Sequence, residues 1–278
     1  MAKDLLEKYN LKPVKHLGQN FLINDAVLEK IVTAANLSPN DTVLEIGPGL
    51  GILTFALARK VKRVIAIEKD KKLAEILNHE LRIRNIKNVE LINGDVLRIQ
   101  NSRFANAGAK FKIQNYKIVA NIPYYLTSPL IRKFLEMENR PETMILMLQK
   151  EVAQRICTQP PKMSLLSIMV QFYAGPKIIA EVSKKSFHPE PKVDSIIIEI
   201  IPKKDLPKIN IEKFFSLVKA GFSAKRKFLI NNLMKKLKLP KSELQNKFSE
   251  FGFDEKIRAE NLSVEKWLKI YENLENNL

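Results

Sequence analysis

The segment Asn121-Ile122-Pro123-Tyr124-Tyr125 combines a side-chain amide, a proline-restricted backbone and aromatic rings directly after the apolar run Ile118-Val119-Ala120. That run is typical of a buried parallel strand, and binding residues of open α/β sheets lie at the carboxyl ends of strands. Such a group suits a flat ligand with hydrogen-bonding edges, such as a nucleobase. From these residues alone, the more ordinary alternative is a strand that runs into a turn with a core tyrosine.

Three further segments place glycines or acids at predicted strand ends, and together they predict a site for an adenosine cofactor. The segment Glu45-Ile46-Gly47-Pro48-Gly49-Leu50-Gly51 connects a predicted strand to a predicted helix. Its glycines allow the backbone to approach a ligand closely. Glu68 ends the second strand, where a carboxylate can accept both hydroxyls of a ribose. Asp95 ends the third strand, where it can accept a hydrogen bond from an adenine amino group.

The glycine spacing also indicates which cofactor binds. Ile52 stands where the dinucleotide fingerprint G-x-G-x-x-G has its third glycine. The chain has no Walker Gly-Lys-Ser/Thr sequence, so ATP hydrolysis is not expected. The spacing and the leading Glu45 instead resemble the first motif of Rossmann-like methyltransferases that use S-adenosylmethionine.

With a methyl donor next to it, the Asn121 segment has a specific chemical interpretation. An exocyclic adenine amine is a poor nucleophile because its lone pair is delocalised into the ring. The side-chain oxygen of Asn121 and the carbonyl of Ile122 could accept both amine hydrogens and favour a pyramidal nitrogen, while Pro123 fixes the backbone. Tyr124 could stack on a base that has left its helix.

The elements that must position these residues alternate along the chain. Predicted strands cover residues 42–46, 64–67, 89–92, 118–121 and 144–148, and helices cover 50–58, 71–84, 126–137 and 165–173. This alternation predicts an α/β fold with a mostly parallel sheet. Two later strands, 178–182 and 195–201, predict an antiparallel hairpin that closes a seven-stranded sheet.

The chain divides into two predicted domains. Residues 1–203 form the cofactor domain with an N-terminal arm, and residues 208–278 form a small all-helical domain. The linker between them, Pro202 to Pro207, contains Lys203, Lys204 and Asp205. From Ile209 onward the sequence shows only helical patterns.

Charge indicates the partner. The 278 residues include 47 Lys and Arg against 30 Asp and Glu, which gives a formal net charge of +17. Phosphate backbones bind such surfaces through counterion release; a lysine-rich proteome or contact with an anionic membrane are the alternatives. Residues 213–241 contain nine Lys or Arg and no acid, which favours RNA contact. The predicted RNA-binding residues are Lys225, Arg226, Lys227, Lys235 and Lys236.

Other classes of protein are disfavoured. No apolar stretch approaches the ~20 residues that span a bilayer. Cys157 is the only cysteine, so an internal disulfide and a cysteine-rich metal site are excluded. His16 and His188 are too isolated to indicate a metal site. We therefore expect an intracellular protein with no bound metal.

Taken together, the motifs resemble the ribosomal RNA adenine N6,N6-dimethyltransferase family, and most closely its KsgA-type members that act on the small ribosomal subunit. The resemblance runs from about Lys15 to Ser263. Besides the segments above, it rests on Leu17-Gly18-Gln19-Asn20-Phe21-Leu22, Gly94-Asp95-Val96, Gln149-Lys150-Glu151-Val152-Ala153, the segment Phe187 to Ser195, Phe222-Ser223 and Lys225-Arg226-Lys227.

The resemblance implies a Rossmann-like class I methyltransferase that dimethylates two adjacent adenosines in a 3′-terminal hairpin of small-subunit (16S) ribosomal RNA during subunit biogenesis. It implies a protein that acts on the immature small subunit in the cytoplasm, and nothing in the sequence demands more than a monomer. The implied cofactor-binding residues are Gln19, Asn20, Leu22, Gly47, Gly49, Glu68, Asp95, Val96 and Asn121. The implied catalytic residues are Asn121, Ile122, Pro123 and Tyr124, with Phe187 packing against the target adenine opposite Tyr124.

Two alternatives stay open. A macrolide-resistance enzyme that methylates large-subunit RNA shares the fold and the core motifs. Gly18, Asp194 and Lys225-Arg226-Lys227 favour the small-subunit target. A non-catalytic ribosome assembly factor could keep the fold, but the intact segment from Asn121 to Tyr124 argues against it.

Overall fold

The computed structural model describes residues 2–11, 13, 19–98, 113–123, 126–250 and 252–277. The chain folds into two compact units, one of Met1–Ala153 with Ala174–Pro202 and one of Gln154–Tyr173 with Lys203–Leu278. The helical unit therefore includes α7 (Leu165–Tyr173), which the predicted division into 1–203 and 208–278 places in the first domain.

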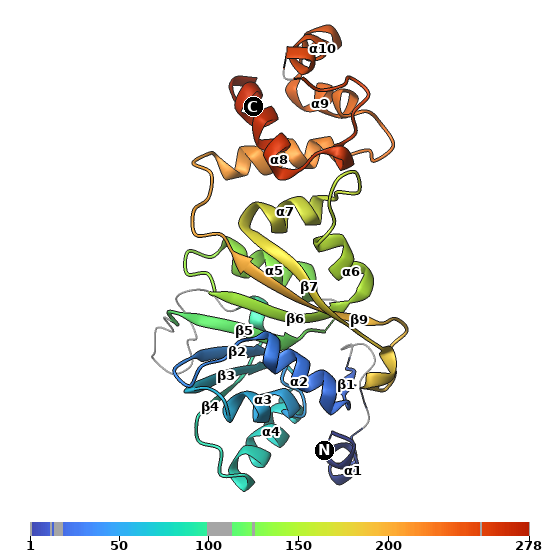
Figure 1. Ribbon diagram of the computed structural model, residues 1–278. Coiled ribbons are helices and arrows are strands. Elements are labelled where there is room, and N and C mark those ends of the chain that lie inside the picture. Colours follow the sequence, from blue (N-terminus) through green and yellow to red (C-terminus); the bar gives the residue numbers. More distant parts are fainter. Residues whose placement is uncertain are drawn as a thin grey trace. The chain divides into compact units, whose positions relative to one another are not determined.

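The first unit is built on a seven-stranded sheet of order β4-β3-β2-β5-β6-β9-β7 (Figure 1). Its strands are β2 (Thr42–Ile46), β3 (Arg63–Glu68), β4 (Val89–Asn93), β5 (Tyr116–Asn121), β6 (Thr143–Gln149), β7 (Ala174–Val182) and β9 (Ser195–Pro202). The strands from β4 to β6 pair in parallel, and β9 pairs antiparallel with both β6 and β7. The predicted parallel sheet with a closing antiparallel hairpin is confirmed.

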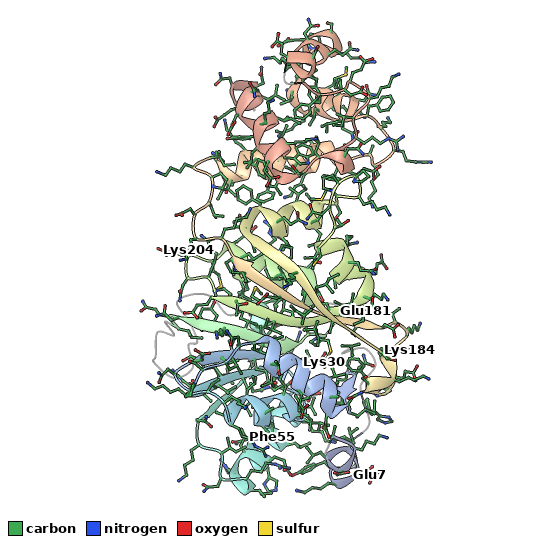
Figure 2. The ribbon with its side chains drawn as sticks, in the orientation of Figure 1. Glu7, Lys30, Phe55, Glu181, Lys184 and Lys204 are labelled. Carbon is green, nitrogen blue, oxygen red and sulfur yellow. The ribbon has the colours of Figure 1, made fainter. Side chains whose placement is uncertain are left out.

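Helices alternate with the strands, and the predicted helices 50–58, 71–84 and 126–137 are among them. They are α2 (Asp25–Ala34), α3 (Ile52–Ala58), α4 (Lys71–Ile83), α5 (Thr127–Glu136) and α6 (Lys150–Ile156). Asn24 caps α2 by accepting from the amides of Ala26 and Val27 at 3.0 and 3.3 Å. The apolar side of α2 joins α3 and the middle strands in one buried cluster, while Lys30 on its other side is exposed (Figure 2).

The structure contains a second, two-stranded sheet that the sequence does not predict. β1 (Phe21–Leu22) pairs antiparallel with β8 (Phe187–His188), so that Phe21 faces His188 and Leu22 faces Phe187. The amide of Ile23 continues this contact by donating to the carbonyl of Ser186 at 2.9 Å. The pairing ties the segment before α2 to the connection between β7 and β9.

The second unit is helical, as predicted for the C-terminal part. With α7 it contains α8 (Ile211–Gly221), α9 (Leu229–Leu237), α10 (Lys241–Glu250) and α11 (Val264–Leu274). Its core is aromatic: Phe172 stacks on Phe214 with ring centroids 5.0 Å apart, and Trp267 and Tyr271 are fully buried. Within the described ranges, no helix is long and apolar enough to cross a membrane.

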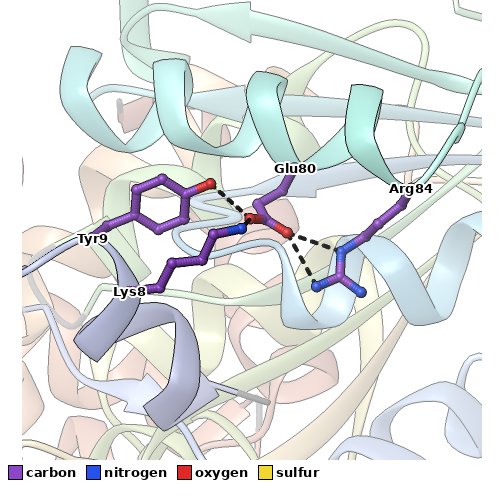
Figure 3. A network of polar contacts seen from close by, with 4 residues as sticks. All are labelled: Lys8, Tyr9, Glu80 and Arg84. Carbon is purple, nitrogen blue, oxygen red and sulfur yellow. Dashed lines mark hydrogen bonds and ion pairs between the residues drawn. The ribbon is translucent and has the colours of Figure 1, made fainter.

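The N-terminal helix α1 (Ala2–Lys8) docks on α4 through both apolar and ionic contacts. Ala2, Leu5 and Leu6 are buried in a cluster shared with α3 and α4. Lys8 Nζ and Tyr9 Oη both lie 2.6 Å from Oε1 of Glu80, whose Oε2 accepts from Arg84 (Figure 3). Burial alone would raise the pKa of Glu80, but these three donors hold it at about 2.

Replacing Glu80 by alanine is expected to lower the free energy of unfolding by about 2 kcal/mol. Glu80 is 1% exposed, and removing a buried partner of an ion pair costs roughly 3–5 kcal/mol. The expected loss is smaller because Lys8 and Arg84 reach water, with side-chain exposures of 50% and 32%. Denaturant unfolding measures the change, and limited proteolysis of residues 2–11 reports release of α1.

The control is Glu75→Ala on the same helix, because Glu75 is exposed and its pair with Lys71 spans 3.9 Å. Such surface pairs contribute about 0–1 kcal/mol. Since the pKa of Glu80 is held below its ordinary value, its contribution is complete near neutral pH and is lost as pH falls toward 2. Equal unfolding curves for the two variants would contradict the proposed anchoring.

Candidate functional site

A pocket lies at the carboxyl ends of β2, β3, β4 and β5, the edge at which α/β sheets bind ligands. It brings together every predicted cofactor-binding residue and, of the predicted catalytic residues, Asn121, Ile122, Pro123 and Phe187. Tyr124 lies outside the described residues, and so does Gly18. Of the thirteen residues predicted to bind the cofactor or to be catalytic, twelve line this pocket.

The glycine loop after β2 shapes the floor of this pocket. Gly51 has φ +80°, and a Cβ there would lie 2.3 Å from Cδ1 of Leu77 on α4, so no larger residue fits. Gly47 has φ +68°, and a Cβ there would lie 3.4 Å from Cδ of Pro123. The loop therefore runs directly beside the Asn121 segment, which joins the two motifs into one site.

Glu68, the last residue of β3, is fixed by backbone donors. Its Oε2 accepts from the amide of Gly49 at 3.0 Å and its Oε1 from the amide of Asp70 at 2.8 Å. Burial raises the pKa of Glu68 above its ordinary value, although these two amides oppose the shift. The carboxylate is thus held by the loop that borders the pocket.

Asp70 extends this network to the segment before α2. Its Oδ2 accepts from Nε2 of Gln19 at 2.9 Å, and its Oδ1 caps α4 by accepting from the amide of Lys72 at 2.9 Å. Both Gln19 and Asp70 line the pocket. Sequence reasoning did not select Asp70, although a polar residue before a helix at a strand end is a recognisable capping signal.

Asp95 stands two residues after β4. Burial alone would raise its pKa, but Nζ of Lys69 at 3.0 Å and the amide of Leu97 at 2.9 Å hold the pKa below its ordinary value. Asp95 is therefore an ionised acceptor at neutral pH. The next residue, Val96, is 4% exposed and supplies an apolar wall.

The Asn121 segment lies at the end of β5. Asn121 pairs with Met147 in the sheet, and the amide of Ile122 donates to the carbonyl of Met147 at 3.3 Å. In the part of the chain that the structure describes, no hydrogen bond involves the side chain of Asn121. The neighbouring strand thus fixes the backbone of Asn121, which lines the pocket.

Phe187 and Leu22, which pair in the β1–β8 sheet, also line the pocket. They are 4% and 6% exposed and belong to the same buried cluster as α2 and the middle strands. Asn20, directly before β1, also lines the pocket. Placement of this wall depends on two chain segments that lie far apart in the sequence.

Glu45 is a buried acid in the pocket wall that the sequence interpretation mentions without assigning it a role. It is 1% exposed, and burial raises its pKa to about 8. Among the described residues, its Oε2 has no hydrogen-bond partner. Nothing in the strand pattern of residues 42–46 indicates that a glutamate between apolar neighbours is buried.

The predicted RNA-binding residues belong to the second unit and lie outside this pocket. Lys225, Arg226 and Lys227 are exposed in the connection between α8 and α9, and Lys235 and Lys236 are exposed in the last turn of α9. Within the described ranges, no group of His, Cys, Asp and Glu residues could hold a metal ion.

Comparison with known proteins agrees with this geometry. The family model described as ribosomal RNA adenine dimethylase matches residues 10–276. The chain belongs to this family. As a member, it is a methyltransferase of ribosomal RNA that uses S-adenosylmethionine, and both predictions are confirmed.

Individual relatives match over nearly their full length. The ribosomal RNA small subunit methyltransferase A of Dehalococcoides mccartyi is 41% identical over 271 residues, which cover 97% of this chain and 91% of that protein. The protein of the same name from Alkaliphilus oremlandii is 41% identical, with 100% and 97% covered.

Two solved structures support the fold. A dimethyladenosine transferase from Plasmodium falciparum has a TM-score of 0.76 at 29% identity, covering 92% of this chain and 98% of that one. The 23S rRNA methyltransferase ErmE has a TM-score of 0.73 at 26% identity, covering 92% and 100%.

The pocket residues fit S-adenosylmethionine. The buried carboxylate of Glu68, held by backbone amides, ends β3, and the ionised acceptor Asp95 follows the neighbouring strand β4. Both line the pocket beside Gly47 and Gly49 of the glycine loop. These residues line one pocket together with Asn121 and Ile122.

Proposed function

We propose that this protein dimethylates the N6 amines of two adjacent adenosines in a 3′-terminal hairpin of small-subunit ribosomal RNA, and that it acts on the immature small subunit. The observation that carries the proposal is the contact between the glycine loop and the Asn121 segment, with Gly47 adjacent to Pro123. A group that activates an amine is useful only next to a methyl donor. The two motifs lie side by side in one pocket.

S-adenosylmethionine supplies the methyl group. In the proposed arrangement Glu68 accepts the ribose hydroxyls, and Asp95 accepts from the adenine amine of the cofactor. Gln19, Asn20, Leu22 and Val96 enclose the cofactor, and Gly47 and Gly49 allow the backbone to approach it closely. The proposed roles are supported by the presence of these residues in the lining of one pocket.

The target base is held on the other side of the pocket. The side-chain oxygen of Asn121 and the carbonyl of Ile122 accept the two amine hydrogens, which localises the lone pair on N6 and stabilises the positive charge that develops there. Pro123 restricts the backbone that presents both acceptors. Phe187 and Tyr124 are the proposed aromatic contacts to the base, which must be flipped out of its helix.

Recognition of the polymer is assigned to the second unit. Lys225, Arg226, Lys227, Lys235 and Lys236 are exposed and lie in a segment without an acid. Cations of this kind contact phosphates and position the substrate without reading its sequence. We propose that the protein works in the cytoplasm as a monomer.

The deciding experiment is incubation of the protein with labelled S-adenosylmethionine and under-methylated small or large ribosomal subunits, followed by mapping of the modified adenines. We expect label in two adjacent adenosines near the 3′ end of the small-subunit RNA. Fully methylated small subunits serve as the control and should take up no label.

The large-subunit target is the second candidate, because the solved structure of ErmE carries the name of a 23S rRNA methyltransferase and shares the fold. Label confined to large-subunit RNA would establish that alternative. Cofactor binding without transfer to either subunit would instead indicate an assembly factor that retains the fold.

A further inference from the structure

The connection between α8 and α9 carries an exposed aromatic ring that no role in the pocket explains. We call residues 223–228 the basic turn; within it Lys225, Arg226, Lys227 and Phe228 are consecutive and exposed. Phe228 is 38% exposed. Within the described ranges, the other large exposed apolar residues are all aliphatic, namely Ile83, Leu165, Ile178, Ile179, Val193 and Ile201.

The backbone of the basic turn is held in place from below. The side chain of Asn232 is 4% exposed, and its Nδ2 donates to the carbonyls of Gly221 at 2.6 Å and Ala224 at 3.1 Å. The amide of Lys227 donates to the carbonyl of Ala224 at 3.1 Å. These bonds anchor the start of the turn, and the residue pair before it, to α9.

The core beneath the turn is tightly packed. A Cβ on Gly221 would lie 2.3 Å from Trp267 and 2.8 Å from Leu229. Phe222 already stacks on Trp267, with centroids 5.9 Å apart. Leu229 is buried, and its amide is bonded to the carbonyl of Ile257 at 2.8 Å. Phe222, Trp267 and Leu229 thus pack beneath the turn, while the Phe228 side chain keeps 38% of its surface exposed.

The residues next to Phe228 favour a nucleic acid over a protein as the partner. A protein partner would cover the ring with apolar groups, but charged residues are depleted from the cores of protein interfaces, and here three cations precede the ring. Single-stranded nucleic acids are bound by cations along the backbone and aromatic rings that stack on the bases. Cations and an aromatic side by side on a fixed turn match that combination.

We infer that Phe228 is a base-stacking site, in which its ring stacks on an unpaired base of the RNA while Lys225, Arg226 and Lys227 contact the adjacent phosphates. This inference rests on the proposed function for the identity of the polymer. It adds a contact that lies outside the pocket for the target adenine. The ring stacks on the flat face of an unpaired base, so the site does not distinguish between bases.

The test compares full-length variants for binding to a single-stranded RNA oligonucleotide and to under-methylated small subunits over a range of salt concentrations. Phe228→Ala is expected to weaken binding by about 5-fold to 150-fold, the range for loss of one stacked base. Its salt dependence should match the wild type because no charge changes. Phe228→Trp should retain tight binding, whereas Phe228→Leu, which keeps an apolar side chain without a ring, should resemble alanine.

Two controls separate stacking from charge and from general effects. Simultaneous replacement of Lys225, Arg226 and Lys227 by alanine should reduce the slope of log K against log salt by about 2, since each phosphate contact on a single strand contributes about 0.7. Ile83→Ala removes an apolar side chain that is 57% exposed and should not change binding. Thermal unfolding of each variant confirms that the fold is retained.

Binding of a blunt duplex with the same sequence provides a further arm, because its bases are already stacked on one another. The loss caused by Phe228→Ala should vanish there. If the wild type binds single-stranded RNA and Phe228→Ala or Phe228→Leu binds it equally well, the stacking site is wrong while the proposed function stands. If the wild type binds no RNA, the proposed function itself fails.

Discussion

Replacing Asn121 with alanine is expected to lower the rate of methyl transfer by about 100- to 1000-fold, the typical loss when one preorganised polar group aimed at a developing charge is removed. The N6 nitrogen gains positive charge as it attacks, and the oxygen of Asn121 is one of two proposed acceptors for its hydrogens. Asn121 lines the pocket at the end of β5.

Single-turnover transfer to under-methylated small subunits measures this effect. RNA affinity should change little, because Asn121 belongs to the pocket and the exposed cations of the second unit contact the phosphates. Asn273→Ala is the matched control, since that amide lies on α11 and bonds only locally, to the carbonyl of Lys269 at 2.7 Å. Wild-type turnover in Asn121→Ala would remove the argument for base activation.

Replacing Glu68 with alanine is expected to weaken cofactor binding by about 100-fold or more. A hydrogen bond to a charged group contributes roughly 1.5–3 kcal/mol, and Glu68 is the proposed acceptor for two ribose hydroxyls. The loop also loses an anchor, because Glu68 accepts from the amides of Gly49 and Asp70 at 3.0 and 2.8 Å. Calorimetric titration with S-adenosylhomocysteine measures the affinity without turnover.

The pH dependence offers an independent check on Glu68. Burial raises its pKa above the ordinary value of 4.5, so protonation begins at a higher pH than for an exposed glutamate. Cofactor affinity should therefore fall as pH drops through that raised pKa, and Glu68→Gln should abolish this fall. Glu90→Gln on the neighbouring strand, with a side chain 42% exposed, should bind as the wild type does at every pH.

Local sequence patterns predict the strands and the residues at their ends. β2 matches the predicted range 42–46, and α7 matches 165–173. The carboxyl ends of parallel strands meet at one edge of the sheet. Polar residues that follow predicted strands, such as Glu68, Asp95 and Asn121, can therefore be predicted to share one pocket, and they do. The roles assigned to these residues stay predictions until the variants are measured.

Contacts between distant segments could not be predicted in the same way. β1 and β8 are two residues each, too short for any periodicity, and their partners lie more than 160 positions apart along the chain. The docking of α1 depends on Glu80, which lies 72 residues from Lys8. Neither contact has a local signature, since its driving force is burial against a surface that exists only in the folded chain.

The pairing of β1 with β8 has a consequence for how the protein matures. Isolated strand pairs of this length are only marginally stable, so Leu22 is placed as a pocket wall only once Phe187 has arrived to pair with it. The N-terminal 150 residues contain the glycine loop, Glu68, Asp95 and Asn121, yet they lack this wall. During synthesis the cofactor pocket is therefore completed late, when about two-thirds of the chain has already been made.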